Sequence, residues 1–207
     1  MVRMSARAIT EFAQGPRTAE AVDAFFAGRS FPIVEGPAIT FVFRGAADAI
    51  HLKHWVFGLP SSQQLTRVDG TDVWYLTLEL PPSSRVEYKL EVVRGGNGEW
   101  MQDPLNPRKA RDPFGANSVA HGEGYELPTW IYPDPESRPG KIDALVLDSK
   151  VFGRPRLEIY LPARFRRTRR YPLMVVHDGH DYLRYAALGT ILDNLMHRLE
   201  IPDMIVA

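Results

Sequence analysis

The sequence contains no cysteine, no long apolar run and no excess of charge of either sign. The absence of cysteine from its 207 residues excludes a disulfide framework, a thiolate nucleophile and a cysteine-based metal site. Its 25 basic and 25 acidic residues cancel, so no overall field favours nucleic acid or an anionic membrane. No stretch approaches the roughly 18 apolar residues of a membrane span, and the N-terminal MVRMSARAITEFAQG lacks the apolar core of a signal peptide. These absences favour a cytoplasmic protein without nucleic-acid or membrane partners.

The composition that remains is that of a globular protein. Hydrophobic residues make up 44% of the chain and charged residues 24%, which is enough apolar material for real cores. The length accommodates one large or two small domains.

A short helix is predicted from Thr18 to Gly28, because Thr18 is a suitable N-cap and Gly28 a suitable end. Between residues 37 and about 121, apolar and polar side chains alternate in runs separated by Gly, Pro, Ser and Asp clusters. Such period-two runs are typical of an antiparallel β-sandwich. We therefore expect an N-terminal helical or extended segment over 1–36 and a β-sandwich domain over 37–126.

A proline-rich stretch, residues 127–140, follows the expected sandwich and is most simply a semi-rigid interdomain linker. A second domain is expected over 141–207. It begins with two predicted strands, 142–147 and 157–161, which flank the turn 151–154.

A strand-turn-helix pattern lies near the C-terminal end of the sequence. The apolar run Leu173–Val176 is typical of a strand buried on both faces of a parallel sheet. It stops at the turn 177–179, and Met204–Ala207 begins what looks like another buried strand. Between them an amphipathic helix is predicted, with one apolar stripe formed by Leu188, Ile191, Leu192, Leu195, Met196 and Leu199.

The turn that contains Asp178, Gly179 and His180 is the first candidate site. In open α/β sheets, ligands bind beyond the carboxyl ends of the strands, and a glycine lets backbone N–H groups approach a substrate closely. An oxyanion or substrate-side role and a purely structural turn both remain open. A metal site is a third alternative, since His177, Asp178, His180 and Asp181 are all ligand types, but their spacing matches no helical His pair.

The run Arg164–Arg170 holds five arginines in seven residues and could contact phosphates. Because the net charge is zero and no nucleic-acid motif accompanies it, a solvated loop is the favoured interpretation.

Four tryptophans, Trp55, Trp74, Trp100 and Trp130, could line a sugar-binding surface or pack in a core. Trp74 lies inside an alternating strand and is expected in the core. Trp100 and Trp130 flank loop and linker segments, which makes them the better candidates for a substrate wall.

These patterns together resemble the enterochelin (enterobactin) esterase family, within the esterase branch of the α/β-hydrolases. The resemblance rests on the order and spacing of motifs that are weak one by one: 31–36, 39–44, 103–107, 114–118, 148–150, 153–156, 160–162, 171–173, 178–179 and 191–195.

This resemblance implies an N-terminal immunoglobulin-like (early-set) β-sandwich joined to an α/β-hydrolase domain. It also implies hydrolysis of catecholate siderophore esters or related carboxylic esters through Ser, acid and His, without a cofactor or metal. The expected partner is a small-molecule ester, with a ferric catecholate siderophore as one candidate.

One departure from the family pattern bears on mechanism. The sequence has no G-x-S-x-G, and every serine precedes the strand at Leu173. In α/β-hydrolases the triad follows that strand in the order Ser, acid, His. The nucleophile and the rest of the triad would therefore lie beyond Ala207, and the α/β-hydrolase domain of this chain is expected to be incomplete. We assign no catalytic residue and expect residues 1–207 alone to be inactive. Only Asp178 and Gly179 correspond to the family's oxyanion-side turn. The adjacent His180 is a local variation on that turn.

Two other functions stay open. The sandwich could be a non-catalytic module that binds a glycan or a protein, with a vestigial hydrolase segment. Alternatively, copies of the chain could associate as a homo-oligomer through the unfinished sheet, because exposed strand edges invite pairing.

Overall fold

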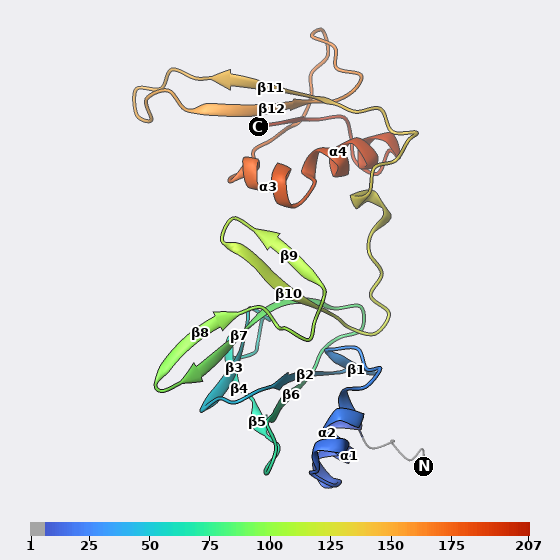
Figure 1. The fold of residues 1–207 in the computed structure, drawn as a ribbon. Helices are drawn as coiled ribbons and strands as arrows, with labels where there is room; N and C mark the ends of the chain where they lie inside the picture. The colour runs from blue at the N-terminus through green and yellow to red at the C-terminus, as the bar shows by residue number, and fades with distance from the viewer. Residues whose placement is uncertain (1–6) are drawn as a thin grey trace. The chain divides into compact units, whose positions relative to one another are not determined.

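The chain folds into two compact units, Met1–Glu126 and Leu127–Ala207, in a computed structural model that describes residues 7–207 (Figure 1). The first six residues of the predicted segment 1–36 lie outside the described range. The regular secondary structure is mostly β-strand, arranged in three separate sheets with short helices. Within the described range, no helix is long and apolar enough to cross a bilayer.

Two antiparallel sheets make up most of the first unit. One has the strand order β1-β2-β6-β5, and the other has the order β4-β3-β7-β10-β9, with β8 also paired to β7. This pairing agrees with the sandwich predicted from the period-two runs. The strands are β1 (Ile33–Glu35), β2 (Ala38–Arg44), β3 (Ala49–His54), β4 (Ser62–Gln64), β5 (Thr66–Arg67), β6 (Val73–Glu79), β7 (Arg85–Arg94), β8 (Asn97–Met101), β9 (Lys109–Asp112) and β10 (Gly115–His121).

The main core of this unit lies between the two sheets. Alternate side chains of β2, such as Phe41, pack in one buried cluster with those of β3 and β7, such as Leu52 and Tyr88. Trp74 belongs to this cluster, as its place in an alternating strand predicts. The rings of Phe41 and Tyr88 meet edge to face with centroids 4.7 Å apart, a favoured aromatic geometry.

Two helices, α1 (Ala8–Gln14) and α2 (Ala19–Phe26), cover the other face of the first sheet. The Thr18 hydroxyl accepts the Ala21 N–H at 3.2 Å, so the predicted N-cap is confirmed. Phe12 and Phe25 stack at 4.3 Å in a second buried cluster, which also holds Val42. Because helices α1 and α2 cover the second face of β2, residues 8–26 pack as part of the first unit.

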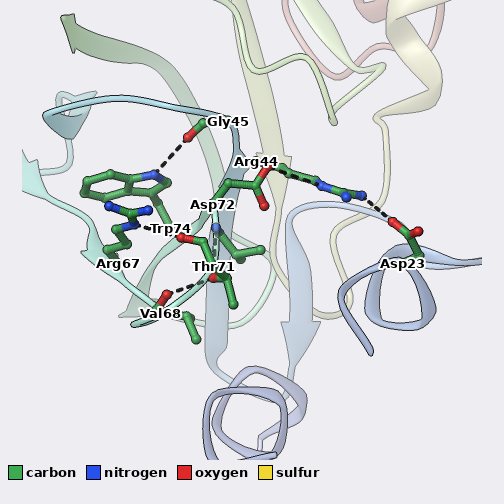
Figure 2. Close-up of polar contacts among 9 residues, drawn as sticks. Asp23, Arg44, Gly45, Arg67, Val68, Thr71, Asp72 and Trp74 are labelled. Atoms are coloured by element: carbon green, nitrogen blue, oxygen red, sulfur yellow. Dashed lines mark hydrogen bonds and ion pairs between the residues drawn. The ribbon is translucent and has the colours of Figure 1, made fainter. Parts of the chain in front are cut away.

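Polar contacts hold the rim of this helix-covered sheet (Figure 2). Arg44, the last residue of β2, donates to Asp23 of α2 at 2.8 Å and lies 3.6 Å from Asp72. On the neighbouring strand, the Trp74 indole N–H donates to the Gly45 carbonyl at 3.1 Å, and the Arg67 guanidinium lies over the Trp74 ring. These exposed ion pairs add little stability on their own, but they orient α2 and the end of β2.

A buried polar network anchors the loop after β8. The Tyr88 hydroxyl donates to Asp103 at 2.6 Å, and the Asn106 side-chain amide donates to the Tyr88 oxygen at 3.0 Å. All three side chains are buried. Burial raises the pKa of the Asp103 carboxyl and that of the Tyr88 phenol, because their charged forms lose solvation.

The second unit contains a third sheet with the strand order β11-β12-β14-β13. β11 and β12 form an antiparallel pair, β14 pairs antiparallel with β12, and β13 pairs parallel with β14. A small core joins β12 and β14 to α4 through Tyr160, Leu192, Met196 and Val206. The elements are η1 (Thr129–Ile131), β11 (Lys141–Val146), β12 (Arg156–Leu161), β13 (Leu173–Met174), α3 (Gly179–Tyr185), α4 (Leu188–His197) and β14 (Ile205–Val206).

The strand predicted to be buried on both faces is not buried in this way. β13 covers only Leu173–Met174, and Leu173 and Val175 are 64% and 66% exposed. β13 is an edge strand that pairs only with β14 in the described chain, and Leu173 and Val175 lie on a largely exposed part of its surface. Leu199, predicted on the helix stripe, also lies outside the core, because α4 ends at His197 and Leu199 has a left-handed φ of 58°.

The proline-rich stretch is tied to α4. The buried Asn194 side chain donates to the backbone oxygens of Trp130 and Tyr132 at 2.9 and 2.7 Å. Arg198 pairs with Asp134 at 3.3 Å. The assignment of residues 127–140 as a linker between domains stays a prediction.

Tyr88→Phe tests the buried network of the first unit. Removing the hydroxyl leaves Asp103 and Asn106 without their shared partner in a buried site. We expect the free energy of unfolding to fall by about 1–3 kcal/mol, measured by urea denaturation. An unchanged midpoint would mean that water enters the site.

Candidate functional site

The turn after β13 lies at the carboxyl end of the one parallel strand pair in the described chain, β13 with β14. Asp178 takes a left-handed conformation with φ 56° and ψ 31°, and Gly179 begins α3. The Asp178 carbonyl accepts the N–H groups of Asp181 and Tyr182 at 2.9 and 3.2 Å. A sharp turn of this kind lets the chain leave the sheet directly into a helix.

Two backbone donors remain free at this turn. In the described part of the chain, the N–H groups of Gly179 and His180 have no hydrogen-bond acceptor. The first N–H groups of a helix have no intrahelical partner and are available to a ligand. The turn therefore offers two backbone donors to a ligand.

A groove of about 870 Å³ opens beside these donors. His180 Nδ1 lies 3.6 Å from Glu158 Oε1 across the groove, and Glu158 Oε2 is buried without a partner in the described chain. The groove thus combines an apolar wall with a few polar groups. Its lining is Arg156, Leu157, Glu158, Leu173, Val175–His180 and Ala207.

Gly179 faces open space. A Cβ added at this position would meet no other atom within 4 Å, and its φ is not in the left-handed region. The fold itself therefore does not require glycine here, whereas the close approach of a ligand would.

The structure brings together Asp178, Gly179, His180 and His177, all of which line the groove. Trp130 does not line it and lies in η1, where its backbone oxygen is bound by Asn194. Trp100 lies on β8 of the first unit and is 51% exposed. The role of Trp100 and Trp130 as a substrate wall stays a prediction.

The metal alternative gains no support from this geometry. Across residues 7–207, no three His, Cys, Asp or Glu side chains are grouped so that they could hold a metal ion. His180 instead faces a single carboxylate, that of Glu158.

Sequence reasoning missed Arg156 and Glu158, which form part of the groove wall. They lie on the same strand as the buried Tyr160 at a spacing of two residues, so their side chains share its face. The sequence feature that could have revealed this wall is the charge of Glu158 inside the otherwise apolar stretch 157–161.

Comparison with known proteins gives a fold but no family assignment. No family model and no curated protein matches the chain. Solved structures of enterobactin esterases do match. That of the enzyme FES from Shigella flexneri in the presence of enterobactin has a TM-score of 0.59 at 20% identity, covering 89% of this chain. Ferric enterobactin esterase from Salmonella typhimurium has a TM-score of 0.58 at 18% identity, covering 82%.

These matches confirm the predicted resemblance at the level of the fold. The chain covers 56% and 52% of those two solved chains, so it spans about half of their length. The similarity extends through both units, since 89% coverage of 207 residues exceeds either unit alone.

Gly179→Ala tests whether the folded structure itself requires glycine at this position. Alanine has room here and favours the first turn of α3, so we expect the free energy of unfolding to stay equal or rise by up to about 1 kcal/mol. Gly140→Ala is the matched control, because its Cβ would overlap the Tyr160 ring and crowd the Leu161 carbonyl. That variant should lose about 1–3 kcal/mol. Thermal denaturation of both variants gives the comparison, and a clear loss in Gly179→Ala would assign the glycine to the fold.

Proposed function

We propose that this chain is part of a carboxylic ester hydrolase of the enterochelin-esterase type. In this proposal the first unit is an immunoglobulin-like early-set sandwich and the second is the beginning of an α/β-hydrolase domain. The boundaries are those expected from the sequence: segment 1–36, sandwich 37–126, linker 127–140 and hydrolase part 141–207.

The observation that carries the proposal is the pair of free backbone N–H groups beside the groove. Ester hydrolysis by the acyl-Ser route develops negative charge on the carbonyl oxygen, and prearranged N–H donors stabilise that charge. Gly179 and His180 offer such donors at the carboxyl end of β13. In α/β-hydrolases the loop after the corresponding strand supplies one donor, and the residue after the nucleophile supplies the other.

The residues of this chain would bind and orient the ester rather than attack it. The apolar wall near Leu173 and Val175 suits the acyl or alcohol portion, and the charged wall at Arg156 and Glu158 suits its polar groups. The nucleophile, acid and His are proposed to follow residue 207. No cofactor is needed for this chemistry.

The proposed substrate is a siderophore lactone or a related carboxylic ester. It is supported by the likeness to structures of enterobactin esterases, one of them solved in the presence of enterobactin. Trp100 or Trp130 as a substrate wall and a cytoplasmic location belong to the same proposal. Association of copies through the β13 edge is a separate alternative to it.

Activity measurements on two forms of the protein test this function. Residues 1–207 should neither release product from activated aryl esters nor react with a fluorophosphonate probe, because no serine follows β13. A form of the chain extended at its C-terminus through a G-x-S-x-G motif should do both. The matched control is the extended chain with that serine changed to alanine.

Two results would contradict the proposal. Labelling of residues 1–207 would mean that one of the upstream serines is a nucleophile. An extended chain that carries the motif but hydrolyses neither aryl esters nor enterobactin would exclude the esterase function itself.

A specific feature favours a second function, glycan binding by the first unit. The Trp100 indole N–H donates to Glu91 at 3.1 Å, and the Lys53 ammonium lies 5.3 Å from the ring centroid. Hydrogen bonds from Lys53 and Trp100 hold the pKa of Glu91 below its usual value. A Cβ at Gly98 would crowd the Glu91 carboxylate, so glycine leaves room for it. The ring is thus fixed on the sheet with half of its surface exposed, as for stacking on a sugar.

Titration with oligosaccharides tests this alternative. Maltoheptaose, cellohexaose and xylohexaose are added to residues 1–207, and binding is followed by calorimetry. If the function is correct, one of them binds and Trp100→Ala weakens binding by about tenfold or more, the loss expected for one stacked ring. Phe114→Ala, which removes another exposed aromatic ring of the first unit, should leave binding unchanged. If none of the three sugars binds, glycan binding at Trp100 is excluded.

A further inference from the structure

A second cavity of the second unit lies at the end of the sheet opposite the Gly179 groove. β12 runs antiparallel to β13 and β14, so its carboxyl end lies at the edge where those two strands begin. A cavity of about 420 Å³ opens there, next to Tyr160 and Pro162. This volume suits a small molecule.

A carboxylate is fixed in the wall of the cavity. The Tyr160 hydroxyl donates to Asp193 Oδ1 at 2.7 Å, and the Gly140 N–H donates to the same oxygen at 2.6 Å. Both donors use Oδ1, and Oδ2 of Asp193 accepts no hydrogen bond from any residue of 7–207. Burial and the Asp193 carboxylate raise the pKa of the Tyr160 phenol, which keeps this donor protonated. Asp193 can therefore receive a cationic group through its second oxygen.

Two arginines without ion-pair partners belong to the lining of the same cavity. Arg138 and Arg164 form no salt bridge with any residue in the described range, whereas Arg169 is paired with Asp203 at 2.9 Å. A guanidinium presents parallel N–H groups that match a carboxylate. The run 164–170, which sequence analysis treated as a solvated loop, thus contributes Arg164 to the cavity wall.

The lining also includes Glu136, His197 and Asp203, of which Asp203 is already paired with Arg169, together with apolar side chains. Met196 of α4, Leu199 and Pro162 provide them, and Leu199 is 88% exposed because of its left-handed backbone. A bound apolar group would cover part of this surface, which is a favourable change.

We propose that this cavity binds a free α-amino acid with an apolar side chain. The ammonium group binds Asp193, the carboxylate binds Arg138 and Arg164, and the side chain lies against Met196 and Leu199. The site is independent of the proposed esterase function, since it shares no lining residue with the Gly179 groove. The Asp193 carboxylate is held by two internal donors and shares the lining with two arginines that form no ion pair, a combination that favours a zwitterion over a simple anion or cation.

The experiment compares an amino acid with its two half-molecules. L-Leucine, 4-methylpentanoate and isopentylamine are titrated into labelled residues 1–207, and binding is followed by NMR chemical shifts and calorimetry. We expect L-leucine to bind with a Kd of about 0.1–1 mM, a normal affinity for so small a ligand. Each half-molecule lacks one charged contact and should bind at least about tenfold more weakly.

Variants of the cavity wall assign the contacts. Arg164→Gln should weaken L-leucine binding by about tenfold, and Asp193→Asn should weaken it similarly. Arg167→Gln removes the same charge from the same run without altering the cavity lining, so it should leave the Kd unchanged. Shifted signals should include those of Ala163 and Leu199.

Three results would overturn the proposal. The first is no shift at about ten times the expected Kd. The second is equal binding of 4-methylpentanoate and L-leucine, which would make the cavity a general anion site. The third is an equal loss in Arg164→Gln and Arg167→Gln, which would reflect only the charge of the loop. None of these results bears on ester hydrolysis, so the two proposals fail separately.

Discussion

The parallel pairing of β13 with β14 determines where the functional groups of the second unit lie. Because β12 runs the opposite way, the carboxyl ends of β13 and β14 form one edge of the sheet, and the carboxyl end of β12 belongs to the other. The free N–H groups at Gly179 mark the first edge, and the Tyr160–Asp193 contact marks the second. The same strand pairing therefore separates the proposed ester groove from the proposed amino-acid cavity.

The first unit is organised by a strand that is covered on both faces. β2 contributes Phe41 to the core between the sheets and Val42 to the cluster under α1 and α2. Since these interiors are filled, chemistry in this unit is confined to its outer surfaces, where the Trp100 ring is held by Glu91 and Lys53.

Much of the local structure follows from the sequence, because it depends on near neighbours. The Thr18 cap, the alternating strands and the turn at Asp178 are of this kind. The exposure of Leu173 could not be predicted, since an apolar run indicates a preference for burial but not which element covers it. The cavity beside Tyr160 could not be predicted from the sequence either, because Tyr160 and Asp193 lie 33 residues apart and meet only through packing. The esterase resemblance, in contrast, depends on the order of motifs, which the sequence displays directly.

Amide hydrogen exchange on residues 1–207 tests the central claim most directly. Parallel pairing at the end of the sheet requires hydrogen bonds from Ile205 N to Pro172 O, from Ala207 N to Met174 O and from Val176 N to Ala207 O, at 3.0, 2.9 and 2.8 Å. We expect these three amides to exchange slowly and the backbone protons of Leu173 and Ile205 to show a nuclear Overhauser contact. Fast exchange at all three, or contacts in an antiparallel register, would contradict the account.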